Sequence, residues 1–265
     1  MKSFAEVSAV VLGPGGAFSA EVCESWYQGP GAYGGLTMAL LVRGAEALSR
    51  GRPLRALQAT FCAPLRAGEV SGRAREVRRG GRVSYLAAEL LQGGSVAASA
   101  LLTFAKDRQA DADYDHVAPH GIAPAEQCPA WPRREGFPAF TQHLEYRQGL
   151  GEAPVSGHEG AAEIGGWVRI LEPPAWDTCY VLALLDAWPP AFYPRLARIR
   201  AAGSVTISAE LHHQGELEQL APNDPLLVTN RSSLMRAGYA SEENWVYGPQ
   251  GRLLAHASQL VALIR

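Results

Sequence analysis

Residues 34–43 read Gly-Gly-Leu-Thr-Met-Ala-Leu-Leu-Val-Arg, and residues 180–188 read Tyr-Val-Leu-Ala-Leu-Leu-Asp-Ala-Trp. Both stretches are apolar on nearly every side, which is typical of a helix that a protein core surrounds. We predict helices over residues 36–49 and 177–188, the second stopped by Pro189-Pro190. The chain therefore contains the same kind of buried helix twice, once in each half.

Alternating apolar and polar residues predict antiparallel strands around each helix. In the first half the expected strands span residues 17–27, 55–65, 69–78, 82–92 and 95–105. In the second half order resumes at residues 139–148, and strands are expected at 163–171, 202–213, 226–236, 238–247 and 252–264. One long helix against such a sheet, present twice, predicts an α+β double hotdog. In this fold two helix-wrapped antiparallel sheets are fused in one chain, and we expect them to join side by side.

The regular spacing of apolar residues that predicts helices and strands is absent between the two halves. Residues 107–138 contain five prolines together with Asp111, Asp113 and Asp115, and read as an irregular connection. We therefore predict an N-terminal hotdog at 1–106, a Pro-rich connection at 107–138 and a C-terminal hotdog at 139–265. The last of these carries the polar residues described below, and the first is expected to be a non-catalytic copy.

The composition and net charge limit the classes of partner that we expect. Of the 265 residues, 47% are hydrophobic and 19% charged, as in a globular protein with a sizeable core. A net charge of −2 gives no electrostatic case for binding nucleic acid or an anionic membrane, so a small molecule or another protein chain is the expected partner. The sequence shows no secretory signal and no long apolar span, and we expect a cytoplasmic protein. The cysteines are far apart and are expected to be buried free thiols, at positions 23, 62, 128 and 179.

Three motifs suggest other functions; the sequence around the first two argues against them, and the third has two interpretations. Gly29–Gly34 satisfies GxGxxG, but the strand that follows ends at Pro64 without the acidic residue that a dinucleotide site requires. His212 and His213 would face opposite sides of a strand, so they do not predict a metal site. An arginine cluster over 73–82 indicates a solvated hairpin, with a phosphate-binding rim as the alternative. We predict no metal and no cofactor.

Polar residues enter the second half where the first half has apolar ones. Matching the helices places Asp186 opposite Val42, and matching the last strands places Gln259 opposite Leu101. The strand over 204–208 alternates hydroxyl and apolar residues, so its hydroxyls are expected to share one face. A carboxylate, a hydroxyl and an amide can together hold and activate one water. The alternative, that these residues only cap helix and strand ends, stays open on residue chemistry alone.

Several motifs resemble one family in order and spacing. In the first half they are Gly34-Gly35-Leu36, Phe61-Cys62-Ala63-Pro64-Leu65 and Arg79-Gly80-Gly81-Arg82; in the second they are Gly165-Gly166-Trp167-Val168-Arg169, Leu184-Leu185-Asp186-Ala187, the strand from Ser204 to His212 and Gly251-Arg252-Leu253-Leu254-Ala255. The chain resembles the acyl-CoA thioesterase II type of double-hotdog protein over nearly all of its length except the connection.

The resemblance implies a reaction and its residues. In that family a water is held by an Asp on the second helix, a Ser or Thr on the next strand and a Gln on the last strand. These positions match Asp186, Ser204 and Gln259, with Thr206 as the alternative hydroxyl. The strand ends Leu211-His212-His213-Gln214, where the family usually has an aromatic or basic pattern, so the resemblance says less about the substrate rim.

The implied function is cofactor-free hydrolysis of an acyl-CoA, or of an acyl group on a carrier protein, by a protein that we expect to be a homo-oligomer. A hotdog hydratase or dehydratase is one alternative, although that chemistry uses an Asp with a His and neither predicted helix contains a histidine. A non-catalytic acyl-binding protein is the other.

Overall fold

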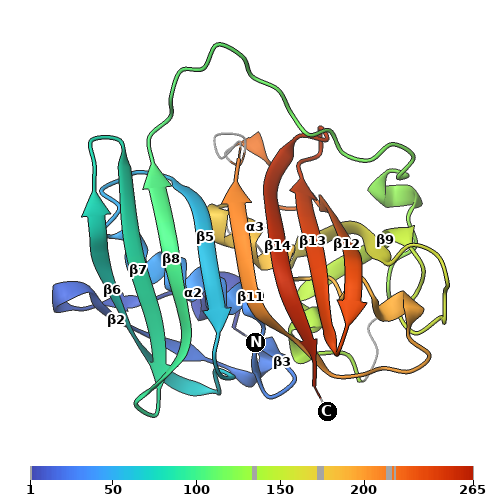
Figure 1. The fold of residues 1–265 in the computed structure, drawn as a ribbon, viewed down its shortest axis with the longest axis horizontal. Helices are drawn as coiled ribbons and strands as arrows, with labels where there is room; N and C mark the ends of the chain where they lie inside the picture. The colour runs from blue at the N-terminus through green and yellow to red at the C-terminus, as the bar shows by residue number, and fades with distance from the viewer. Residues whose placement is uncertain (1, 133–135, 172–175, 213–216, 218, 265) are drawn as a thin grey trace.

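The computed structural model describes residues 2–132, 136–171, 176–212, 217 and 219–264. Within this part of the chain, twelve strands form one continuous antiparallel sheet, and the two longer helices pack against each other and against one face of that sheet (Figure 1). This is the double-hotdog architecture that the repeated helix and strands predicted.

Most element boundaries lie within a few residues of the predicted ones, but the strands predicted at 17–27 and 55–65 end early, at Val22 and Phe61, and residues 139–143 form a 3₁₀ turn before the strand. The strands of the first half are β1 (Val11–Leu12), β2 (Ala17–Val22), β5 (Leu54–Phe61), β6 (Gly68–Arg79), β7 (Val83–Gln92) and β8 (Ser95–Ala105), beside a small ribbon of β3 (Tyr27–Gln28) and β4 (Gly31–Ala32). Those of the second half are β9 (Leu144–Gly151), β10 (Glu163–Ile170), β11 (Ala202–Leu211), β12 (Leu226–Arg236), β13 (Tyr239–Tyr247) and β14 (Leu253–Leu263). The α-helices are α1 (Phe4–Val7), α2 (Gly34–Glu46) and α3 (Thr178–Leu185), and the 3₁₀ turns are η1 (Pro14–Gly16), η2 (Glu24–Trp26), η3 (Ala125–Gln127), η4 (Ala139–His143) and η5 (Tyr193–Arg195).

The strand order shows how the two halves join. It runs β1-β2-β6-β7-β8-β5-β11-β14-β13-β12-β10-β9, so the first strand after each long helix lies at the centre of the sheet. There β5 and β11 pair antiparallel, from Thr60 opposite Thr206 to Ala56 opposite Glu210. The two hotdog sheets therefore join side by side, as expected, and both long helices are covered by one curved surface.

Close contact between α2 and α3 depends on a glycine. A Cβ built on Gly35 would lie 2.8 Å from the Cα and carbonyl oxygen of Ala183, so only a residue without a side chain allows this approach. The second helix is shorter than predicted, because it ends at Leu185 rather than 188. Pro189 prevents the helix from continuing past it, but the helix ends four residues earlier.

The connection after β8 passes over one end of the sheet to reach the second half (Figure 1). Its later residues are held against β9, because Trp131 N–H donates to the Tyr146 carbonyl and Gln148 N–H to the Pro129 carbonyl. The Trp131 indole also donates to Gln148 Oε1 at 2.7 Å. This part of the connection is therefore held in place against β9 by hydrogen bonds and belongs structurally to the second half.

The expected burial of the free thiols holds for only part of the set. Cys128 and Cys179 are buried, but Cys62 is exposed and Cys23 is half-buried. Cys62 lies just past the last residue of β5, where the chain leaves the sheet, and this explains its exposure. No helix in the described part of the chain is long and apolar enough to cross a bilayer.

Candidate active site

Asp186 lies immediately after the last residue of α3. The helix begins at an N-cap, Asp177, whose side chain accepts the Tyr180 N–H, and it ends at Leu185. Asp186 therefore takes the C-cap position, with backbone angles of −111° and 17° outside the helix. Its carboxylate lies beyond the buried stripe of α3 and points toward the other long helix.

The N-terminus of α2, from the first half of the chain, meets this carboxylate. The Gly35 N–H donates to Asp186 Oδ2 at 3.1 Å. A Cβ on Gly34 would lie 2.5 Å from the same oxygen, so the carboxylate rests directly on the helix end. The free N–H groups and the dipole at a helix N-terminus both favour an anion there. The site is therefore shared between the two halves.

The protonation of Asp186 is poised near neutrality. Burial raises the pKa of its carboxyl from an ordinary 3.8 to about 7, because the charged form loses its hydration. Hydrogen bonding from Gly35, Gly34 and the Ser204 side chain lowers the pKa and only partly offsets burial. The residue as a whole is half-buried, so one side of it still borders open space. A carboxyl in this state can exchange a proton at physiological pH.

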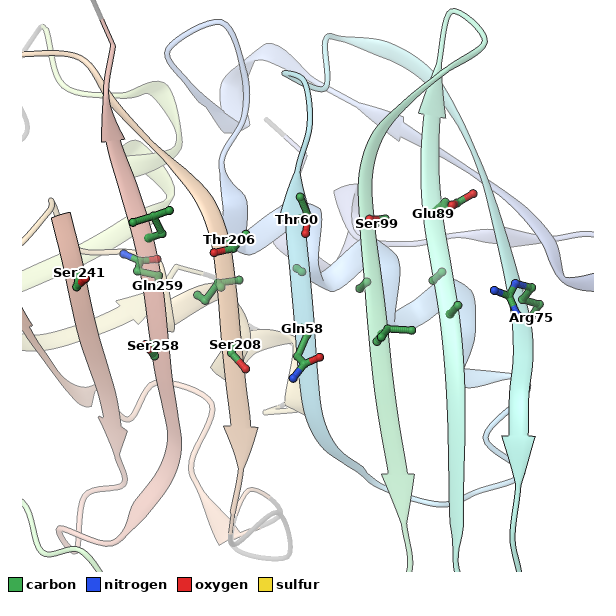
Figure 2. Close-up of a pocket in the computed structure, with 17 residues that line it drawn as sticks. Gln58, Thr60, Arg75, Glu89, Ser99, Thr206, Ser208, Ser241, Ser258 and Gln259 are labelled. Carbon is green, nitrogen blue, oxygen red and sulfur yellow. The ribbon is translucent and has the colours of Figure 1, made fainter. Parts of the chain in front are cut away.

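A β-bulge decides which hydroxyl of β11 reaches Asp186. Ser204 pairs with Val261 of β14 and Thr206 with the next residue, Leu260, so Val205 is an extra residue in the ladder. Ser204 then faces the helices, whereas Thr206 is exposed and lines a shallow polar depression on the outer face of the sheet (Figure 2). The expectation that the hydroxyls over 204–208 share one face is therefore wrong.

Gln259 lies on the inner face of β14, with 8% of its surface exposed. The residue of the first half that corresponds to Gln259 is Leu102, and the predicted Leu101 is wrong by one position. Leu102 of β8 faces Leu57 as Gln259 faces Ile207, and Leu102 is buried, whereas Leu101 is 54% exposed. The predicted contrast between the two halves is still present, because this inward-facing position is apolar in the first copy and polar in the second.

Glu242 is a residue of this site that the sequence analysis did not identify. It lies on β13 directly opposite Gln259, and Gln259 Nε2 donates to Glu242 Oε2 at 3.2 Å. Only 1% of its surface is exposed. The signal was present in the alternation of β13, which places Glu242 on the same face as the buried Ala240, Asn244 and Val246.

An apolar pocket of about 910 Å³ opens beside these groups. Its lining includes Gly34 and Ser204, which contact the Asp186 carboxylate, and Ala187, the residue after Asp186. Part of its wall is an aromatic cluster of Trp131, Tyr146 and Trp188, whose ring centroids lie 5.1–5.9 Å apart. The Tyr146 hydroxyl donates to the Ala187 carbonyl at 2.9 Å, which ties this cluster to the residue next to Asp186.

The other motifs have ordinary structural roles. In the arginine cluster, Arg73 pairs with Glu89, and Arg79 pairs with Glu76 and donates to the Leu48 carbonyl. This pairing supports the hairpin reading over a phosphate rim. His213 falls outside the described residues. Within the described chain, His, Cys, Asp and Glu side chains do not gather in groups of three that could hold a metal ion.

Comparison with known proteins agrees with this geometry. The profile of the acyl-CoA thioesterase C-terminal domain matches residues 124–263, and that of the N-terminal domain matches residues 23–105. The chain therefore belongs to the acyl-CoA thioesterase family of double-hotdog proteins. A search of proteins with curated functions gives no match.

Solved structures with the same fold cover the chain from end to end. A hotdog-fold protein of unknown function from Alicyclobacillus acidocaldarius is 24% identical, with a TM-score of 0.89 over 100% of this chain and 99% of the other. A Thermobifida fusca protein, provisionally assigned as a thioesterase II, is 21% identical, with a TM-score of 0.86 over 100% and 98%. Acyl-CoA thioesterase II TesB2 from Mycobacterium marinum is 14% identical, with a TM-score of 0.78 over 99% and 98%. At these identities the likeness shows the shared fold.

Proposed function

We propose that the protein hydrolyses an acyl-CoA thioester to a free acid and CoA, with water as the nucleophile. One observation carries the proposal: the Asp186 carboxyl, with a pKa of about 7, lies at the N-terminus of a helix and next to Gly34 and Ala187, which line an apolar pocket. A carboxyl whose pKa lies near the working pH is suited to take a proton from water. The family to which the chain belongs supports the thioester as substrate.

In the proposed reaction, Asp186 accepts a proton from the water while the water oxygen attacks the thioester carbonyl carbon. Ser204 and Gln259 hold and orient that water. Negative charge grows on the carbonyl oxygen, and the positive end of α2 lies where it can stabilise that charge. The tetrahedral intermediate then collapses, the carbon–sulfur bond breaks, and the CoA thiolate takes up the proton that Asp186 holds.

The apolar pocket is the proposed site of the acyl chain. Its wall of Trp131, Tyr146 and Trp188 offers a large apolar surface close to Asp186. Burial of an acyl chain there releases water from both surfaces and supplies binding free energy without a charged contact.

The rival chemistries lack a partner for Asp186. A hydratase or dehydratase needs a second acid or base, usually histidine, and the described groups that shift the Asp186 pKa include none. The buried histidine, His143, instead contacts the Ser25 carbonyl and stacks on Trp26. A binding protein without activity would not need a carboxyl poised near pH 7.

The proposal includes three further expectations. Residues 1–106 and 139–265 are expected to be two hotdog domains, which residues 107–138 join. The protein works in the cytoplasm on lipid-derived thioesters, with a carrier-protein thioester as a variant substrate. It forms a homo-oligomer, because β1 leaves one edge of the sheet without a further strand within the described chain, whereas residues 129–131 pair with the β9 edge. Light scattering after size-exclusion chromatography measures the last point.

The test is a thiol-release assay on a panel of acyl-CoAs and one acylated carrier protein. We expect hydrolysis by the wild type and a loss of about 10²-fold or more in Asp186→Asn, which cannot accept the proton. Binding of a non-hydrolysable acyl-CoA analogue, measured by calorimetry, shows whether the variant still takes substrate. Binding without hydrolysis in the wild type would contradict the proposal and favour an acyl-binding protein.

A further inference from the structure

Glu242 is a carboxylate that is buried almost completely and has no basic partner among the described residues. Its exposed fraction is 1%, and it lies on the inner face of β13. Removing a carboxylate from water is costly unless hydrogen bonds replace the lost hydration. Such a residue is therefore expected to have a specific task in the second half of the chain.

The contacts of Glu242 all lead toward the site. Gln259 Nε2 donates to its Oε2 at 3.2 Å, and hydrogen bonding from the main-chain N–H groups of Ala191 and Phe192 lowers its pKa. Those two residues belong to the loop that follows Asp186. Burial, with a smaller contribution from the negative charge of Asp186, raises the pKa of Glu242 to about 7. The two carboxyls are thus close enough to affect each other.

We infer that Glu242 is a positioning residue for the hydrolytic water, acting by fixing the orientation of the Gln259 side-chain amide. The inference rests on the proposed function and adds a residue to it. Glu242 need not touch the substrate or the water. Its effect passes through Gln259, whose other polar atom, Oε1, is buried and has no hydrogen-bond partner among the described residues.

Hydrogen-bond chemistry explains why the amide needs this partner. An ionised carboxylate can only accept, so it selects the amide orientation with Nε2 toward Glu242 and Oε1 turned away. An amide oxygen that faces the water accepts one of its hydrogens, as Asp186 accepts the other. A lone pair of the water then remains free to attack the carbonyl. The flipped amide would donate to that lone pair and block the attack.

The same logic predicts an effect of pH. When Glu242 is protonated, its hydroxyl can donate to Oε1 of Gln259, and the flipped amide orientation becomes favourable. Two titratable groups of neighbouring elements face Glu242: Asp186 after α3, and Tyr193 of η5, whose pKa burial and the Glu242 charge both raise. Protonation of either Asp186 or Glu242 should therefore slow the reaction as the pH falls.

The test is a double-mutant cycle with Glu242→Gln and Gln259→Leu. We expect Glu242→Gln to lower kcat about 10-fold or more with little change in KM, since it misplaces the water and leaves the acyl pocket intact. In the Gln259→Leu background the same change should cost nothing more, because its effect acts through Gln259. Glu243→Gln, on the outer face of the same strand, is the matched control and should behave as the wild type.

Two readouts separate this role from a structural one. As the pH falls through the pKa values of the two carboxyls, the acid limb of log kcat/KM should become steeper than a slope of one in the wild type and should keep a slope of one in Glu242→Gln. In ¹⁵N spectra, the side-chain amide resonances of Gln259, identified by their loss in Gln259→Leu, should move with pH in the wild type and stop moving in Glu242→Gln.

The outcomes also distinguish this inference from the proposed function. If Asp186→Asn is inactive while Glu242→Gln keeps wild-type kcat and acid limb, the positioning role is wrong and the thioesterase stands. If the wild type hydrolyses no thioester while the Gln259 amide follows Glu242, the proposed reaction fails and the pairing stands. The pairing would be overturned if the losses of kcat in the double-mutant cycle were additive. It would also be overturned if the pH dependence of the Gln259 amide resonances were the same with and without Glu242.

Discussion

Asp186→Asn should strongly reduce turnover and at the same time stabilise the protein. The asparagine side chain can still accept from the Gly35 N–H, so the local geometry is largely kept. It has no ionisable oxygen, so it cannot take the proton of the water, and turnover should fall by about 10²-fold or more. The gain in stability follows from burial, which acts against the charged form of the wild-type residue.

The size of the gain can be worked from the pKa of Asp186. Its folded-state pKa is about 7, against an ordinary 3.8. Because the folded protein binds the proton more tightly than the unfolded chain, stability falls as the pH rises from about 4 through 7. At about 1.36 kcal/mol per pKa unit, the full penalty is roughly 4 kcal/mol. Partial solvent access to the half-buried residue reduces it, so we expect ~2 to 4 kcal/mol at pH 8.

Urea unfolding of both proteins at pH 8 and pH 4 tests this reasoning. The variant should be more stable than the wild type by the stated amount at pH 8, and by less than about 1 kcal/mol at pH 4. Glu243→Gln again serves as the control, with no change in turnover. A stability difference that is the same at both pH values would refute the buried, ionised carboxylate. Turnover within a few-fold of the wild type would refute its role as the base.

Further substitutions test the remaining parts of the site. Ser204→Ala should slow turnover about 10-fold or more, while Thr206→Ala on the outer face of the same strand should leave it unchanged; equal effects would contradict the bulge assignment. Gly34→Ala places a methyl group 2.5 Å from Asp186 Oδ2 and should reduce kcat by about 10²-fold without loss of fold, checked by circular dichroism; wild-type kcat would show that the carboxylate is free to move. Trp131→Ala removes part of the pocket wall and should raise KM for the preferred acyl-CoA about 10-fold with a smaller change in kcat; an unchanged KM would place the acyl chain elsewhere.

The fold was predictable because its signals are local. Two helices that are apolar on nearly every side are stable only when other elements bury them on every side. The alternation of apolar and polar residues with a period of two predicts the strands that bury them. The strands over 226–236 and 95–105 begin and end at the predicted residues. The second helix was predicted too long, because Pro189 marks only the farthest point a helix can reach and not where it ends.

The site was less predictable, because two of its features are not local. Gly35 and Asp186 are 151 positions apart, and no pattern along the chain predicts that a helix N-terminus of the first half meets that carboxylate. The bulge at Val205 moves Ser204 to the inner face, and a shift of one residue changes the face of every side chain beyond it. Glu242 was visible in the alternation of its strand, but a charged residue there is ordinarily solvated.

The duplicated scaffold also explains why the described chain has this site on one side only. Across the helix pair, the N-terminus of α3 occupies the place corresponding to the N-terminus of α2. There Arg43 of α2 donates to Asp177, the N-cap of α3, at 2.7 Å, and to Ser8 at 3.2 Å. The corresponding space is thus closed by an ion pair, and Leu102 stands on the inner face where the second copy has Gln259. The helix N-terminus of the first copy contacts the carboxylate of the second, and the inner position of the first copy that corresponds to Gln259 is apolar, as the proposed single site requires.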